Sequence, residues 1–379
     1  MLEGLLNSFS DLPDPRCKPR TDHCLIDVLV IAVCAVIAGA ETWVDIALYG
    51  RSKEGWLRTF LKLRSGIPSH DTFRRVFTII DPKLFEQHFY QWVSLLLQPI
   101  DREVIAIDGK SVRGSANRAV KQSPLHLVSA FATEQGISLG QLAVDSKSNE
   151  IKAIPALLDC LFLKGNIVTI DAMGCQRDIA QKIIDQQADY IIALKGNQEK
   201  RHNAVVEYCR TVCTAVPASI SPDYDAFDDS HGRTVRRRGW VLPLTDELTL
   251  LQDWPGIRNI IMIENIRCVD HSSETTCELR YYLSSCRDAP VAQIAAVRQH
   301  WAIENSLHWV LDVTFREDDS RIRDQVATRT FALLRKMALN IVRRDTTSKA
   351  SLRGRRKNAG WNNDYMAYLL FNCGEKSPP

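Results

Sequence analysis

The stretch that decides the fold is Val104-Ile105-Ala106-Ile107-Asp108, an apolar run that ends in an acid. A short apolar run rich in β-branched residues predicts a buried strand. Two further strands are expected over residues 125–133 and 137–144, because Glu134-Gln135-Gly136 between them is typical of a tight hairpin. These three strands begin a sheet.

The pattern of an apolar run followed by an acid recurs where Ile167-Val168-Thr169-Ile170 is followed by Asp171. An amphipathic helix precedes this run, and a helix over 176–187 and a strand over 190–194 follow it. Three strands with a hairpin, then helix, strand, helix and strand, is the order of an RNase H-like sheet. We therefore predict an α/β fold with an RNase H-like mixed sheet flanked by helices.

The chain outside this sheet divides into further segments. Apolar helical patterns separated by glycines and prolines predict an all-helical N-terminal domain over residues 1–98. A catalytic domain is expected over 99–345, with a strand-rich insertion at 199–290 that is too long for a loop. Residues 346–379, which begin with many arginines and lysines, are expected to form a basic C-terminal tail.

Charge alone does not identify a partner, because 48 basic and 45 acidic side chains give a net charge of only +3. Within the helical domain, Ser69 is placed to cap a helix that carries Arg74 and Arg75. That helix could read DNA, or it could be an ordinary solvated helix. We find no export signal and no apolar run long enough to span a bilayer, so a cytoplasmic, nucleoid-associated protein is expected.

The two acids that follow apolar runs suggest a metal site. If their strands are neighbours, Asp108 and Asp171 lie close together, and both stay ionised only with a cation between them. Oxygen ligands of this kind select Mg²⁺ or Mn²⁺. Two such ions, held about 4 Å apart, support phosphodiester cleavage and transfer without a nucleophilic side chain.

A third ligand is expected from a helix over residues 292–313. His300, Glu304, His308 and Asp312 form a polar stripe on it, and Glu304 lies in the middle. The stripe drifts around an α-helix by about 40° per step, so only two or three of its members can face one site. An exposed polar face is the ordinary meaning of such spacing, and a zinc site using both histidines is a further alternative.

Several ordered motifs cover nearly the whole chain: Gly66–Asp71, Ile107–Ser115, Thr169–Gln176, Ala193–Gln198, His231–Arg233, Arg280–Ser285 and His300–Asp312. Together they closely resemble the transposases of bacterial insertion sequences, specifically the H-repeat-associated protein family. The resemblance implies that Asp108, Asp171 and Glu304, which are 63 and 133 residues apart, form a metal-binding DDE triad. Related families carry Tyr, Arg and Lys around the glutamate, whereas this chain has His300 and Leu311 at two of these positions. The phosphate-contacting roles of that signature are therefore not transferred.

Basic residues are the candidates for DNA contact, with a solvated surface charge as the alternative for each. Neighbours along a strand alternate faces, so arginines in the insertion are placed to hold DNA from more than one side. Contacts of this kind give salt-sensitive, largely sequence-independent affinity. The candidates are Lys110, Arg113, Lys195, Arg233, Arg236, Arg237, Arg238, Arg298, His308, Arg74 and Arg75.

The function expected from these observations is a metal-dependent DNA transposase that uses two Mg²⁺ or Mn²⁺ ions. It cleaves double-stranded DNA at element ends and transfers the 3′-hydroxyl to target DNA. A homodimer or a larger assembly is expected, since two ends must be brought together. The alternatives are a catalytically silent DNA-binding protein descended from a transposase and a nuclease of RNase H-like type. The sequence leaves the element ends, the target preference and the excision pathway open.

Overall fold

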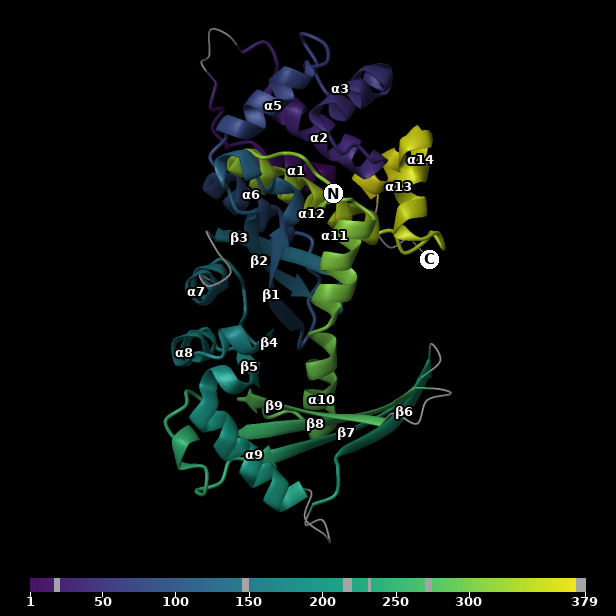
Figure 1. The fold of residues 1–379 in the computed structure, drawn as a ribbon. Helices are drawn as coiled ribbons and strands as arrows, with labels where there is room; N and C mark the ends of the chain where they lie inside the picture. Colours follow the sequence, from purple (N-terminus) through teal and green to yellow (C-terminus); the bar gives the residue numbers. More distant parts are fainter. Residues whose placement is uncertain (17–20, 145–149, 214–219, 231–232, 270–274, 373–379) are drawn as a thin grey trace.

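The computed structural model describes residues 1–16, 21–144, 150–213, 220–230, 233–269 and 275–372. Helices gather at one end of an elongated molecule, a sheet with flanking helices forms the middle, and long strands form the other end (Figure 1). The predicted mixed α/β architecture with a large sheet is confirmed.

In the described part of the chain, one sheet of nine strands runs in the order β3-β2-β1-β4-β5-β9-β8-β7-β6. β1 pairs antiparallel with β2 and parallel with β4, and β4 pairs parallel with β5. The helices α7 (Glu150–Asp159) and α8 (Arg177–Asp185) connect these core strands in the predicted order. The core strands are β1 (Val104–Val112), β2 (Leu125–Ala132), β3 (Ile137–Val144), β4 (Ile167–Ile170) and β5 (Asp189–Leu194).

β1 is longer than its apolar run. Asp108 was expected directly beyond the strand, but it lies inside β1 and is paired with Ser129 of β2. β2 remains paired with β1 as far as Val112, whereas β4 ends opposite Ile107. Asp108 is therefore held on one side by a strand and is open on the other, where β4 has ended.

The segment 199–290 continues the same sheet, because β9 pairs antiparallel with β5. It contains the helix α9 (Glu199–Cys213) and a strand that the sequence did not indicate, β6. The acidic stretch that forms β6 is stabilised by the arginines of β7, since Asp225 accepts two hydrogen bonds from Arg236 at 2.9 and 2.6 Å. The strands are β6 (Tyr224–Ser230), β7 (Arg233–Pro243), β8 (Asn259–Val269) and β9 (Thr275–Ser284).

The helical end is joined to the sheet by α12 (Gln325–Arg343). This helix packs against α2, α5 and α6 and also against β2 and β3. The apolar run predicted to be a buried core helix is α2, and nearly all of its side chains are buried. The N-terminal helices are α1 (Leu2–Phe9), α2 (Leu25–Ala38), α3 (Trp43–Ser52), α4 (Glu54–Leu57), α5 (His70–Ile79) and α6 (Pro82–Ser94).

The helix expected over 292–313 is interrupted. α10 (Pro290–Gln299) is followed by a turn, by the π-helical segment η8 (Ile303–His308) and by α11 (Trp309–Val313). A π-helix has more residues per turn than an α-helix, so it offsets the drift of a stripe whose members are four residues apart. His300, Glu304 and His308 can therefore all face the sheet.

Most of the predicted basic C-terminal tail, residues 346–379, is helical where the structure describes it. Within it, α13 (Leu352–Trp361), α14 (Asn363–Ala367) and η9 (Tyr368–Asn372) fold, and α13 packs on α2 (Figure 1). Arg356 is buried there. Its guanidinium donates to the carbonyl oxygens of Val36 at 2.9 Å, Ile37 at 3.3 Å and Thr314, which lie at the C-terminal ends of α2 and α11. This arginine thus has a structural partner for its charge.

Within the described ranges, no single helix is long and apolar enough to cross a membrane. α2 and α3 meet that test only as a pair, bent by 96° at the break between them.

Replacing Arg356 with alanine is expected to lower the free energy of unfolding by about 2–4 kcal/mol, because buried carbonyl groups lose their donor. Urea denaturation of the purified protein measures this change. Arg353→Ala, an exposed position one turn earlier on α13, is the matched control and is expected to stay within about 0.5 kcal/mol of wild type. Equal effects of the two changes would contradict a structural role for Arg356.

Candidate active site

One cavity, with a volume of about 340 Å³, is lined by all three predicted acids. Asp108 comes from β1, Asp171 follows β4, and Glu304 lies on η8. The carboxyl ends of β4 and β5, together with β9 and the turn after α10, complete the walls. Residues that are distant in the sequence therefore meet at one edge of the sheet.

The environment of Asp108 disfavours the ionised form of its carboxylate. Burial raises its pKa to about 7, and the nearby carboxylates of Asp171, Glu304 and Glu150 add to this, although the Gly109 amide opposes it. The Nδ1 atom of His308 lies 3.5 Å from its Oδ2. A cation at this carboxylate would relieve the repulsion.

Asp171 is fixed by the backbone that follows it. Its Oδ1 accepts hydrogen bonds from the amides of Met173 at 3.0 Å and Gly174 at 3.4 Å, which caps the short helix η5 (Ala172–Gly174). Burial raises its pKa and Glu150 adds to the rise, whereas these amides and Lys195 lower it. The second carboxylate oxygen has no part in the cap.

Glu304 is exposed on η8, so its carboxylate is accessible from the cavity. The histidines on either side of it are neutral, because burial lowers the pKa of His300 to about 4 and of His308 to about 3. The Nδ1 atom of His300 lies 3.0 Å from the Thr169 hydroxyl. In the described ranges, these histidines form no cluster of three potential metal ligands, so the zinc alternative gains no support.

The donor set of this cavity fits divalent cations. It consists of carboxylate oxygens, the ligands that Mg²⁺ and Mn²⁺ prefer. Within the described residues, the three acids do not form a group whose ligand atoms all lie within 4.8 Å of one another. A site for two ions about 4 Å apart does not require all ligand atoms to form one such group, because different ligands contact different ions.

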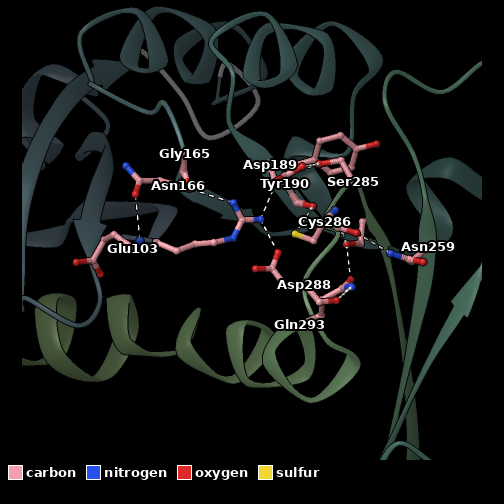
Figure 2. Close-up of polar contacts among 12 residues, drawn as sticks. Glu103, Gly165, Asn166, Asp189, Tyr190, Asn259, Ser285, Cys286, Asp288 and Gln293 are labelled. Atoms are coloured by element: carbon pink, nitrogen blue, oxygen red, sulfur yellow. Dashed lines mark hydrogen bonds and ion pairs between the residues drawn. The ribbon is translucent and has the colours of Figure 1, made fainter. Parts of the chain in front are cut away.

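A different cluster of potential metal ligands does meet the 4.8 Å limit, but an arginine side chain already lies against it. Asp189, Cys286 and Asp288 offer ligand atoms within 4.8 Å of one another and lie together in Figure 2. The guanidinium of Arg102 contacts Asp189 at 2.7 Å and Asp288 at 2.5 Å. These carboxylates raise the pKa of Arg102 even though burial opposes the rise. The cluster therefore joins the start of β1, β5 and the residues before α10.

Two of the predicted DNA contacts, Lys110 and His308, have largely buried side chains. Lys110 is only 11% exposed, and its ammonium group contacts Asp312 at 2.5 Å and Glu317 at 2.6 Å. It lies two residues after Asp108 in β1 and so shares its face, which is covered by α11. His308 is buried beside Asp108. Both side chains are therefore largely shielded from solvent.

The other basic candidates lie at or near the surface. Lys195 lines the cavity and is exposed, and Arg113 has 84% of its side chain exposed beside Asp318. Arg74 and Arg75 are exposed on α5, whose predicted cap is present: Ser69 accepts a hydrogen bond from the Thr72 amide. The side chain of Arg233 lies outside the described residues, as do His231 and Gly232.

The remaining arginines of β7 differ by face. Arg236 and Arg238 lie on one face, where they pair with Asp225 at 2.6 Å and Glu264 at 2.5 Å. Arg237 lies on the other face and donates to the neutral side chain of Asn265 at 3.0 Å. Alternation along the strand therefore separates neutralised arginines from one whose charge is less compensated.

Sequence reasoning missed two residues near the triad. Arg280 of β9 lines the cavity, with its guanidinium 5.1 Å from the ring centroid of Trp301. The only signal for it was its place in a motif shared with the resembled family. Glu150, whose charge acts on Asp108 and Asp171, begins α7 and had no distinguishing pattern.

An acid triad at one edge of a mixed sheet is the arrangement expected of a transposase DDE domain, and the chain matches the family model with that description over residues 99–341. A model described as DDE_Tnp_1-associated matches residues 6–93. The chain belongs to the DDE transposase family, within the group of H repeat-associated transposases. Domains of this family are metal-dependent and typically use Mg²⁺ or Mn²⁺.

Similar proteins cover nearly the full length. "Putative transposase YncI" of Escherichia coli O157:H7 is 41% identical over 99% of this chain and 96% of its own length. "H repeat-associated putative transposase YhhI" of Escherichia coli K12 is 37% identical over 98% of this chain and 99% of its own. A solved piggyBac transposase synaptic complex with hairpin DNA has a TM-score of 0.39 and 10% identity, covering 100% of this chain and 83% of that one. Similarity this low carries no argument.

Replacing Asp108 with asparagine is expected to stabilise the metal-free protein at pH 8. The pKa of Asp108 in the fold, about 7, lies above its ordinary value of 3.8, so its ionised form destabilises the folded state. The free-energy cost of folding with an ionised Asp108 has its full value above pH 7, and it decreases as the pH falls from 7 toward the ordinary pKa of 3.8. The melting temperature in EDTA should rise by about 2 °C or more at pH 8, with a smaller difference at pH 5.

Asp101→Asn, an exposed aspartate that precedes β1, is the control and should melt like wild type at both pH values. A metal-free Asp108→Asn protein that melts below wild type at pH 8 would show that this carboxylate is not under electrostatic strain.

Proposed function

We propose that this protein is an active DNA transposase that cleaves at the ends of its element and joins the freed 3′-hydroxyl to target DNA. Asp108, Asp171 and Glu304 would hold two Mg²⁺ or Mn²⁺ ions. The observation that carries the proposal is the presence of all three carboxylates on one cavity, where burial and mutual repulsion favour a cation.

The strand, cap or helix that carries each acid determines how rigidly its carboxylate is held. Two divalent ions, when bound, activate an attacking water or 3′-hydroxyl and stabilise the leaving oxygen of a phosphodiester. Asp108 is fixed by strand pairing and Asp171 by backbone amides, so both are preorganised. Glu304 lies on a π-helical segment and is more exposed, and segments of this kind are frequent at functional sites.

A basic face beside the cavity supports a path for DNA. Arg237 shares a row of the sheet with Asn265 and Glu278, and Glu278 lines the cavity. Burial lowers the pKa of Arg237 and the nearby charges of Arg298 and Arg280 lower it further, although Tyr224 and Asp228 oppose this. Like charges gathered in this way favour a polyanion.

The hydrogen-bond partners on this face differ from those on the opposite one. On this face Arg280 is paired with Glu278 at 2.8 Å, but Arg237 and Arg298 donate to neutral groups, the Asn265 amide oxygen at 3.0 Å and the Tyr224 hydroxyl at 3.3 Å. Arg236 and Arg238 are matched to carboxylates. We therefore place phosphate contacts on the Arg237 face, together with Lys195 at the cavity, and treat Arg236 and Arg238 as structural. Arg74, Arg75 and Arg113 are proposed as outer contacts.

The reaction also requires an assembly. Two element ends must be held together for coordinated transfer, so a homodimer or larger complex on DNA is proposed. A monomer on paired ends would contradict this part of the proposal.

Asp171→Asn and Glu304→Gln are each expected to reduce Mg²⁺-dependent cleavage of element-end DNA by about a thousandfold or more, equivalent to about 4 kcal/mol in the barrier. Both changes remove a ligand charge and keep the side-chain shape. Gel assays of cleavage and of strand joining, with the cognate ends and a supplied 3′-hydroxyl, measure the two steps.

DNA binding by the same variants, measured in EDTA, is expected to be retained or slightly stronger than that of wild type, since each change removes a negative charge that repels phosphate and removes no basic contact. Full cleavage by either variant would remove that residue from the mechanism. Wild-type cleavage without joined product would identify a nuclease, and neither activity, with binding retained, would identify a silent DNA-binding protein.

Arg237→Gln is expected to weaken DNA binding by about threefold to tenfold and to lower the salt dependence of log K by about one phosphate contact. Fluorescence anisotropy with duplex DNA at several salt concentrations measures both quantities. Arg236→Gln, the adjacent residue on the opposite face, is the control and should keep the salt dependence of wild type. Equal losses in the two variants would contradict a one-sided DNA path.

A further inference from the structure

Glu150, the first residue of α7, is a buried carboxylate beside the candidate active site. Only 3% of the residue is exposed. α7 packs against η5, the short helix that Asp171 caps. Glu150 does not line the cavity, so it lies behind the triad.

A chain of hydrogen bonds fixes its position. The His126 Nε2 atom lies 2.6 Å from Oε1 of Glu150, and His126 Nδ1 lies 2.9 Å from the Ser111 hydroxyl. Ser111 of β1 and His126 of β2 are register partners, so their side chains lie on the same face of the sheet. Asp108 is an odd number of residues from Ser111, and its side chain therefore points to the other face.

Gly109 allows this carboxylate to approach the backbone of β1. A Cβ atom at Gly109 would lie 2.4 Å from Oε1 of Glu150 and 2.7 Å from Nε2 of His126. The space that any other side chain would fill is therefore occupied by the His126–Glu150 pair. The negative charge of Glu150 lies against the residue that follows Asp108.

The partners of Glu150 differ from those of three other buried glutamates, whereas Glu103 accepts from the neutral Glu134 amide and the Gln135 side chain. Glu86 is paired with Arg329, Glu264 with Arg238, and Glu317 with Lys110. Among the described residues, the partner found for Glu150 is His126. Its charge acts on both aspartates of the triad, and on Asp171 it is the largest contribution from another charge.

We propose that Glu150 is a positioning residue of the metal centre, whose charge, held behind Asp108 and Asp171 by His126 and Ser111, strengthens divalent-cation binding. It acts through the electrostatic field and is not itself a ligand. This inference rests on the proposed function, because it assumes that the triad binds metal. Outer partners of metal ligands commonly contribute about tenfold to hundredfold to affinity.

The test is Glu150→Gln, which removes the charge and keeps an oxygen that can accept from His126. Titration calorimetry with MnCl₂ on the full chain, without DNA, should show about tenfold weaker binding than wild type. The increase in melting temperature on adding MnCl₂ should shrink accordingly. The melting temperature in EDTA should be equal to or above that of wild type, because a repulsive charge is gone; a merely structural role would lower it.

Two reference variants make the result decisive. Glu264→Gln, which removes a buried carboxylate far from the triad, is expected to keep wild-type Mn²⁺ affinity. Asp171→Asn is expected to lose most of it. If Asp171→Asn binds Mn²⁺ normally, the proposed function fails; if it loses binding while Glu150→Gln does not, only the inference on Glu150 is overturned.

Glu150→Asp serves if the glutamine variant does not fold. It keeps the charge but withdraws it by one methylene group, so a severalfold loss of Mn²⁺ affinity is expected. Unchanged affinity in this variant would equally overturn the proposal.

Discussion

The gathering of carboxylates at one cavity is the constraint on which this structure depends. Asp108, Asp171 and Glu304 meet there, with Glu150 behind them, and burial together with these charges raises the pKa of Asp108. Such a cluster persists only if the surrounding structure fixes it, because the charges alone would separate. Strand pairing on Asp108 and amide caps on Asp171 supply this rigidity.

The same constraint explains the neighbouring ion network. Burial opposes ionisation of Glu317, yet Lys110, Lys336 and Arg335 hold its pKa down at about 2. Lys110 also contacts Asp312 of α11, so this charged group connects β1, α11 and α12. Because η8 runs directly into α11, the network anchors the helix that carries Glu304. A lysine that looked like a DNA contact in the sequence instead holds the third acid in place.

The sequence predicted what local pattern determines and missed what distant partners determine. The apolar runs before Asp108 and Asp171 predicted adjacent strands, and the hairpin and the order of elements followed. The length of β1 was missed because β2 sets it, and β6 was missed because its aspartates become a strand only beside the arginines of β7. Lys110 is paired with acids about two hundred residues away in the sequence, and the periodicity of the local sequence cannot reveal such partners. The folded C-terminal helices were missed for a related reason: Arg356 looks like a solvated charge until the carbonyl groups of α2 are placed beside it.

The charge pattern around the cavity finally suggests an order of binding. DNA brings further negative charge to a site that already holds several carboxylates, so phosphate and triad repel each other without cations between them. Arg237 and Arg298 are the proposed contacts for the DNA backbone, yet neither lines the cavity that holds Asp108. In the proposed function, the basic face would attract the duplex, and ions at the triad would let a phosphodiester approach the acids. DNA binding and metal binding would then be coupled, and cleavage would require both.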